Sequence, residues 1–299
     1  MKMLLNVLVS SVPLLLASAG ALVSEYAGVL AVFIDGLINL SAFLTFLFAY
    51  WTGSAAAACI LAALCAVVVA LLASYYTEKT KANPFVTGIV LNLFSSGFTS
   101  VCSSLVFRTK GVLSPAILAS SFSFPEGLFP SLTNEISLFA FFLPAFVCVL
   151  GLYPVVRYTK WGLRLVVAGA APDILKKKGV EPAFYRCSSW VIAAVFAAAA
   201  GGILTLRLSS FVPNISSGRG WIALAAVFLG RRNVFGVIAS SLLFTAAGYA
   251  ADSIQTAAGV SFIPPSVLPS LPYIAATVVF FLRRTPQKRK NRRGNQCGN

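Results

Sequence analysis

The chain has 299 residues, of which 58% are hydrophobic and only 10% are charged. Soluble proteins carry about 25% charged residues, so this composition excludes a water-soluble fold. The 23 Lys and Arg residues against 8 Asp and Glu give a net charge of +15, and the absence of His removes the commonest general base and metal ligand.

Apolar blocks follow one another along the chain, most of them close to the roughly 20 residues that a helix needs to cross a bilayer. They lie at about 4–23, 27–50, 55–76, 84–107, 136–156, 187–208, 212–230, 233–251 and 267–282. Because these blocks lack the two-residue alternation of a barrel strand, we expect helices. The predicted fold class is an all-α polytopic integral membrane protein with about 8–10 transmembrane helices, some of them short or broken.

The first block imitates a secretory signal peptide, because Lys2 precedes an apolar run that reaches the small residues 17–19. We expect an uncleaved first span instead, since the run continues through Val23 and further spans follow. Residues 1–282 are predicted to form a single transmembrane domain.

Polar side chains inside the apolar blocks are candidates for a functional site. Asp35 would cost about 2.5–3.5 kcal/mol at the bilayer centre, which indicates a polar cavity, a partner or an interfacial position beside a helix break. Asn39 lies one helical turn further on, so both side chains could line one side of a pathway. Asp35 and Gly36 also make 27–50 the best candidate for a broken or re-entrant block.

Asn92 lies in a block that Pro84, Gly88 and Gly97 weaken as a helix. Its amide is suited to hydrogen-bond a polar, uncharged solute. The alternative is an amide that joins two packed helices, which is as common a use of Asn in membranes.

Two basic stretches orient the molecule. Residues 157–186 contain two acidic residues, Asp173 and Glu181, and seven basic ones: Arg157, Lys160, Arg164, Lys176, Lys177, Lys178 and Arg186. The tail 283–299 is basic and polar, and we expect it to be disordered and to attract anionic lipid rather than nucleic acid. The positive-inside rule places both stretches in the cytoplasm, and counting back through the blocks places the N-terminus outside.

The segment 218–236 is the most distinctive in the chain, because four glycines bracket a short apolar stretch that ends in a basic turn. Short, glycine-interrupted segments in corresponding positions of two halves indicate a transporter site near the midplane. Residues 28–36 are a candidate counterpart in the first half.

Enzyme motifs are missing from the sequence. It has no H-E-x-x-H, no G-x-S-x-G and no phosphate-binding loop, so any energy for transport must come from an ion gradient or a partner. The six cysteines contain no C-x-x-C pair. We therefore expect no enzyme activity, no metal and no cofactor.

Three motifs resemble the permease subunits of bacterial ABC importers of the branched-chain amino acid and ribose type, in the branch that serves simple sugars, nucleosides and riboflavin. In the first, 27–43, Asp35 stands where the family has Glu. The second is 81–94, whose L-N-L centre contains Asn92. The third, 218–244, contains Trp221 and departs mainly at Val234, where the family often has Pro.

Residues 163–182 resemble the cytoplasmic loop that this family presents to its ATPase, although Ala170 and Ala171 replace the usual Glu-Asn. Pro172 at a first turn, acidic Asp173 beside it and Gly179 at the end favour a short surface helix. Such a helix could dock in a groove of the ATPase; the alternative is a basic loop that only obeys the positive-inside rule. The residues assigned to coupling are Arg164, Pro172, Asp173, Lys176, Lys177, Lys178 and Gly179.

The resemblance implies four partners: an ATP-binding cassette subunit, a second permease subunit that is identical or not, an extracellular binding (lipo)protein, and the lipids of a bacterial inner membrane. ATP would be used by the partner, and nucleic acid is not a partner. The residues assigned to the pathway are Asp35, Asn39, Asn92 and Trp221. The first three, with many of the 24 phenylalanines, favour a solute with a flat ring and hydroxyls, riboflavin or a purine nucleoside, with a simple sugar next. An ion-coupled secondary transporter is the alternative function.

Overall fold

The computed structural model describes residues 2–109, 111–114 and 135–258. These form helices and one isolated antiparallel bridge between Leu113 and Phe211. The helices are α1 (Lys2–Tyr26), α2 (Ile34–Thr52), α3 (Ala55–Thr80), α4 (Pro84–Phe107), α6 (Glu135–Tyr158), α7 (Lys160–Ala170), α8 (Pro172–Lys177), α9 (Pro182–Leu208), α10 (Arg219–Leu229) and α11 (Val234–Ala258). The expected block 267–282 and the tail 283–299 lie outside the described residues.

The all-α membrane fold is confirmed. Five of the described helices, α1, α2, α3, α4 and α9, are long and apolar enough to cross a membrane, and a bent pair made by α6 and α7 adds a sixth. α10, with 11 residues, and the stretch Val234–Ala250 of α11 are shorter apolar helices. With these two shorter apolar helices the described residues contain eight candidate spans, the lower end of the expected 8–10.

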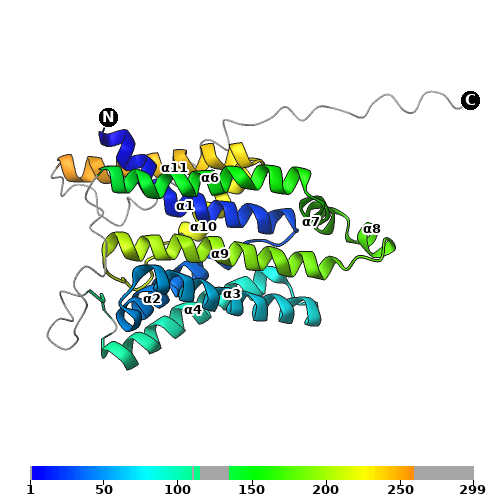
Figure 1. The fold of residues 1–299 in the computed structure, drawn as a ribbon, viewed down its shortest axis with the longest axis horizontal. Coiled ribbons are helices and arrows are strands. Elements are labelled where there is room, and N and C mark those ends of the chain that lie inside the picture. The colour runs from blue at the N-terminus through cyan, green and yellow to red at the C-terminus, as the bar shows by residue number, and fades with distance from the viewer. Residues whose placement is uncertain (1, 110, 115–134, 259–299) are drawn as a thin grey trace, which may run out of the picture.

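The long helices run side by side, with α7 and α8 at one end of the bundle and the start of α1 at the other (Figure 1). In α1 and α2, 83% and 78% of the most apolar window is buried, against 22% in α3 and α4. α9 packs against α1, α2 and α3. The centre of the molecule is therefore made by α1, α2 and α9, and the outer layer by α3 and α4.

Small residues let the central helices approach closely. A Cβ added at Gly201 of α9 would lie 2.4 Å from the carbonyl oxygen of Ile38 in α2. About three turns nearer the start of α9, the ring of Trp190 stacks on that of Phe33 with centroids 3.9 Å apart. On α3, the buried face is a run of small residues four apart: Ala58, Ala62, Ala66, Ala70 and Ser74.

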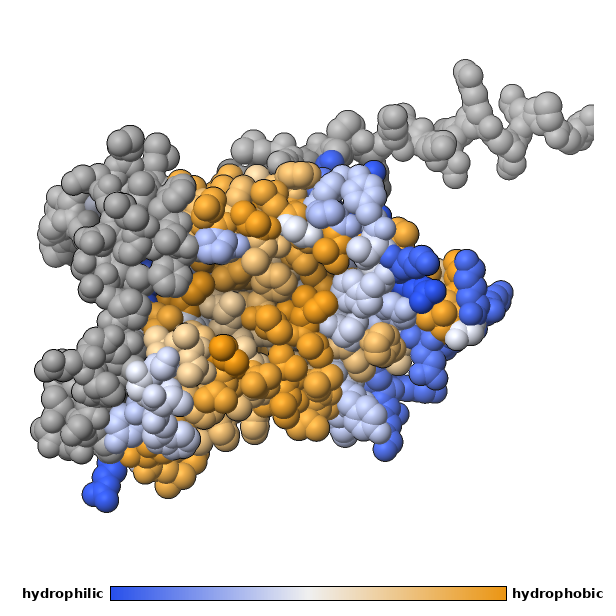
Figure 2. All heavy atoms as spheres, in the orientation of Figure 1, coloured by the Kyte–Doolittle hydropathy of each residue, from blue (hydrophilic) through white to orange (hydrophobic). Residues whose placement is uncertain are grey.

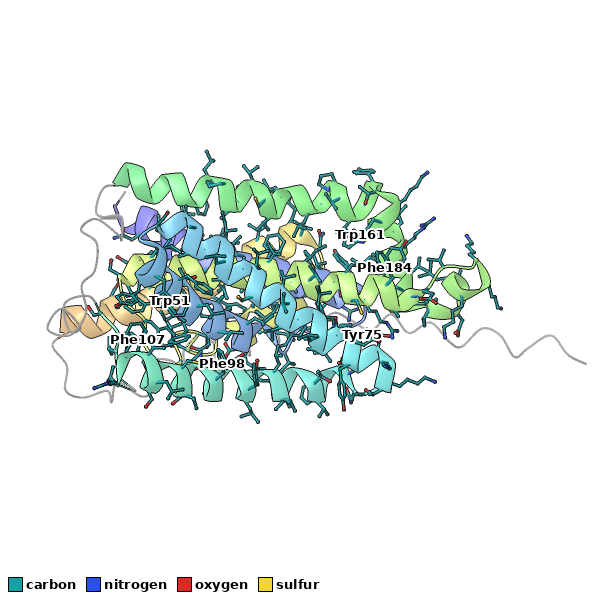
Figure 3. The ribbon with its side chains drawn as sticks, turned by 60° about the horizontal axis from the view of Figure 1, so that its bottom comes forward. Trp51, Tyr75, Phe98, Phe107, Trp161 and Phe184 are labelled. Atoms are coloured by element: carbon teal, nitrogen blue, oxygen red, sulfur yellow. The ribbon has the colours of Figure 1, made fainter. Side chains whose placement is uncertain are left out.

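Apolar side chains cover the middle of the face shown in Figure 2, and hydrophilic ones gather at the α7–α8 end. Aromatic side chains mark the two ends of the apolar zone: Trp51 and Phe107 lie toward one end, and Tyr75, Trp161 and Phe184 toward the other (Figure 3). Aromatic belts of this kind are typical of the two membrane–water interfaces. The bundle therefore presents a membrane-spanning zone with α7 and α8 at one surface.

Candidate functional site

Two interrupted helices begin next to each other in the interior. α2 starts only at Ile34, because residues 27–33 form turns, with Gly28 at φ +77°, where helix was expected from 27. α10 likewise starts at Arg219, after a non-helical stretch with positive φ at Asn214, Ser217 and Gly218. The prediction that Asp35 and Gly36 break the block 27–50 is wrong, because α2 runs through both residues without a break. The short helix expected within 218–236 is confirmed as α10.

Asp35 joins these two helix starts. Its Oδ1 accepts a hydrogen bond from the backbone N–H of Gly220 at 2.9 Å, and its Oδ2 accepts one from the Ser216 hydroxyl at 3.2 Å. The carboxylate thus satisfies a free N–H in the first turn of α10, where the helix dipole favours negative charge. Gly220 is required here, since its Cβ would lie 2.5 Å from the Asp35 backbone nitrogen.

Asn92 of α4 likewise accepts a backbone N–H at the start of α2. Its Oδ1 accepts from the backbone N–H of Gly36 at 2.8 Å, and its Nδ2 donates to the carbonyl oxygen of Val32 at 3.0 Å. A Cβ at Gly36 would lie 2.6 Å from that Oδ1. The amide therefore bridges the last turn before α2 and the first turn within it.

Asn39 of α2 is 4% exposed and its side chain contacts α4. Its Nδ2 donates to the Thr99 hydroxyl over a long 3.5 Å, while within the described residues its Oδ1 and the Ser95 hydroxyl have no hydrogen-bond partner. Trp221, next to Gly220 on α10, is 43% exposed. The structure therefore gathers the pathway candidates around the first half of α2, and three of them are engaged within the protein.

The second group of predicted residues forms the surface helix α8. Pro172 is its first residue, and Gly179, at φ +71°, closes it. The N–H groups of Gly179 and Val180 donate to the carbonyl oxygens of Lys176 and Leu175, both at 3.0 Å, which is a Schellman cap. The predicted short helix is confirmed, with Leu175 buried and with exposed side chains at Asp173, Lys176, Lys177 and Lys178.

A longer surface helix, α7, was missed by the sequence interpretation, which expected a loop. It turns by 77° from α6 at Thr159, whose hydroxyl accepts from the Gly162 N–H at 3.1 Å. Its inner face is Gly162, Leu165 and Ala168, all buried. The N-cap Thr followed by apolar or small residues three apart was the available signal. Arg164, on α7, donates to the Tyr185 hydroxyl at 3.1 Å.

An ion pair near α7, between a buried carboxylate and a half-exposed guanidinium, was also missed. Glu25, which is 3% exposed, accepts from the Arg232 guanidinium at 2.8 Å. The neighbouring Tyr26 hydroxyl donates to the carbonyl oxygen of Arg232. α7 packs closely against the end of α1, since a Cβ at Gly169 would lie 2.3 Å from the Tyr26 carbonyl oxygen. The signal in the sequence was an acidic residue at the end of an apolar block.

No group of three or more His, Cys, Asp or Glu side chains that could hold a metal ion occurs in the part of the chain that the structure describes. The chemistry that the arrangement offers is therefore hydrogen bonding and stacking in the interior, and a cationic surface at the α7–α8 end.

Three similar proteins are ABC transporter permeases. The nucleoside permease NupC of Lactococcus lactis is 27% identical over 300 residues, covering 93% of this chain and 90% of that protein. The guanosine permease NupQ of Bacillus subtilis is 26% identical, covering 79% and 77%. TsgC13 of Haloferax volcanii, assigned to glucose, is 29% identical, covering 77% and 71%.

A solved structure of a metal-chelate type ABC transporter in an inward-facing conformation aligns with a TM-score of 0.50 and 19% identity, covering 91% of this chain and 85% of that one. At this identity the likeness concerns the fold. The family model described as "Branched-chain amino acid transport system / permease component" matches residues 3–282, and this multi-pass membrane protein belongs to that permease family.

Proposed function

We propose that this chain forms half of the translocation pathway of a bacterial ABC importer, in the inner membrane, for a nucleoside or a simple sugar. The observation that carries the proposal is a short capped helix at one surface that is linked through α7 and the end of α1 to two helix starts in the interior. A separate ATP-binding subunit supplies the energy, a binding protein delivers the solute, and a second permease completes the pathway.

A nucleoside is the favoured solute, because two of the three relatives described above are nucleoside or guanosine permeases. Riboflavin, the other flat-ring solute, has no support from those three. Among the pathway candidates we assign solute contact to Trp221, whose side chain is the most exposed of the four and can stack on a ring. Asp35 and Asn92 hold the helix starts that shape the pathway.

The docking element for the ATP-binding subunit is α8. Its lysines Lys176, Lys177 and Lys178 are exposed, and so is the apolar Ile174, at 52%. A small helix with an apolar side chain and a cationic end fits a groove with acidic walls. α8 itself lies at the end of the bundle, beyond α7 (Figure 1). We place it, and with it the C-terminus, on the cytoplasmic side because of its charge.

A chain of contacts connects α8 to the interior. α7 follows the bend of α6 and presses Gly169 against Tyr26. Tyr26 and Glu25 hold Arg232 in the turn after α10, and the other end of α10 holds Asp35. A displacement of α7 and α8 by the ATPase would therefore shift α10 as a rigid unit and move the start of α2.

The decisive experiment measures ATP hydrolysis by the permease co-purified in lipid with its candidate ATP-binding subunit. Loaded binding protein is added with a nucleoside, a sugar or a flavin. We expect stimulation by one of the nucleosides. The proposal is wrong if hydrolysis never responds, and if uptake instead collapses with an ionophore at constant ATP, which is the behaviour of an ion-coupled transporter.

A variant tests α8 directly. Gly179→Pro cannot adopt φ +71° and loses the N–H that closes the helix. We expect hydrolysis to become independent of loaded binding protein while the protein stays in the membrane. Gly179→Asn is the control, because Asn tolerates this conformation. Normal transport by Gly179→Pro would remove the assignment of α8.

A further inference from the structure

A pocket of about 480 Å³ lies between the bend from α6 into α7 and the turn between α10 and α11. Its walls are largely apolar, with valines from α6, α7 and α11 and the ring of Phe235. Its polar groups are Arg157, Arg232, Asn233 and two tyrosines. The pocket is thus amphipathic, and it is formed by segments distant in the sequence.

The charge of this pocket is positive. No Asp or Glu belongs to its lining, and in the described ranges Arg157 has no carboxylate within 4.0 Å. Arg232 is paired with Glu25 on one side, but 54% of its side chain stays exposed. The guanidinium of Arg157 lies over the ring of Tyr153, 5.8 Å from its centre, in a cation–π contact.

The pocket lies at the level of the bundle that we expect at the surface of the bilayer. α7, which forms one wall, turns by 77° from α6 and buries one face while exposing Lys160 and Arg164 on the other. With Leu163 also exposed, at 55%, α7 is suited to lie in the plane of an interface. Trp161, at the start of the same helix, belongs to the aromatic end of the bundle seen in Figure 3. The pocket mouth is therefore at headgroup level.

We propose that this pocket binds one anionic phospholipid of the leaflet at the α7–α8 end. The phosphate lies between Arg157 and Arg232, and the start of an acyl chain follows the valine walls. Basic pockets between membrane helices are suited to anionic headgroups, and apolar walls add nothing to the binding of a free phosphate ion. The lipid bridges α6 and α7 to the turn after α10.

The test uses the full chain purified in phosphatidylcholine nanodiscs that contain a small fraction of phosphatidylglycerol. Native mass spectrometry counts the phosphatidylglycerol molecules retained after release from the disc. We expect one tightly retained phosphatidylglycerol, with about tenfold weaker retention in Arg157→Gln. Lys81→Gln is the matched control, since it removes an exposed cation at the end of α3, outside the pocket. Equal losses in both variants would show general charge attraction and overturn the proposal.

A second variant separates a lipid from a soluble anion. Val166→Trp fills the apolar part of the pocket and leaves both arginines in place. We expect it to weaken phosphatidylglycerol retention as Arg157→Gln does, and we expect inorganic phosphate not to compete. Retention that is unchanged in Val166→Trp and is displaced by phosphate would identify an ion site and contradict a lipid site. Absence of any retained phosphatidylglycerol in the unmodified chain would also overturn it.

Discussion

The two ends of α10 are held by carboxylates from the start of the chain in two physically different ways. At the N-terminal end, Asp35 accepts a backbone N–H and a hydroxyl, both from residues just before or within α10. Beyond the C-terminal end, Glu25 pairs with the side chain of Arg232, and its Oε1 has no hydrogen-bond partner among the described residues.

The contact of Asp35 with Gly220 is therefore a fixed joint, and the Glu25–Arg232 pair is an adjustable one. A backbone N–H can follow its acceptor only if the whole helix moves, and Gly220 leaves no free space around the contact. A guanidinium on a long side chain can exchange partners at the membrane surface, because Arg232 is half exposed. We expect motion that starts at α7 to reach α10 through the Glu25–Arg232 pair, while the Asp35 contact keeps its geometry, and substitutions test that contrast.

The largest effect is expected for Gly220→Ala. The added Cβ would lie 2.5 Å from backbone and Cβ atoms of Asp35, so α10 must separate from α2. We expect the free energy of unfolding to fall by more than about 4 kcal/mol, so that size-exclusion chromatography in detergent shows no peak of folded protein. Gly151→Ala on α6 is the control, since nothing lies within 4 Å of its added Cβ. A normal melting temperature for Gly220→Ala would disprove the fixed joint.

The ion pair should respond asymmetrically. Arg232→Gln leaves the buried Glu25 carboxylate unpaired and should cost about 3 kcal/mol. Glu25→Gln leaves a cation that can reach water and should cost about 1 kcal/mol. Thermal unfolding of both variants and of the double variant measures this, and the double variant should recover most of the loss. Equal costs for the single variants would contradict the adjustable joint.

Asp35→Ala should be intermediate. It removes the acceptor for both the Gly220 N–H and the Ser216 hydroxyl and should cost about 2 kcal/mol. Asp35→Asn keeps one oxygen that can accept from Gly220, so we expect a smaller loss. The same unfolding assay compares the two. If Asn is as damaging as Ala, the negative charge rather than the hydrogen bond holds α10.

The smallest effect is expected for Tyr26→Phe. It deletes the hydrogen bond to the Arg232 carbonyl oxygen at a half-exposed position, which should cost at most about 1 kcal/mol. Tyr76→Phe, at a side chain that is 62% exposed, serves as the control. A loss in Tyr26→Phe larger than in Asp35→Ala would reverse the ranking of the two ends.

The sequence was sufficient where local chemistry decides the structure. The helix expected at 84–107 is α4 to the residue, because Asn83 caps it and Pro84 is compatible only with its first turn. In the same way Pro172 and Gly179 frame α8. By contrast, apolar content alone could not show that residues 27–33 are turns, since an apolar turn and an apolar helix have the same composition.

The interior contacts were not predictable for a different reason. Glu25 and Arg232 are 207 positions apart, and each looked like an ordinary charge at the end of an apolar block. The roles of Asp35 and Asn92 as partners of backbone N–H groups also depend on which helices become neighbours. The sequence pattern identified Asp35 and Asn92 as exceptional, but the packing of the helices determines which groups they bind.

α2 lies at the centre of the bundle but is synthesised early, so its packing waits for helices that are made much later. Asp35 leaves the ribosome 185 residues before the Gly220 that it binds, an interval of about 10–40 s at ordinary translation speeds. During that time α2 can pack against α3 and α4, but its later partners α9 and α10 are still missing. Chains that stall before α9 should therefore be preferred substrates of membrane proteases.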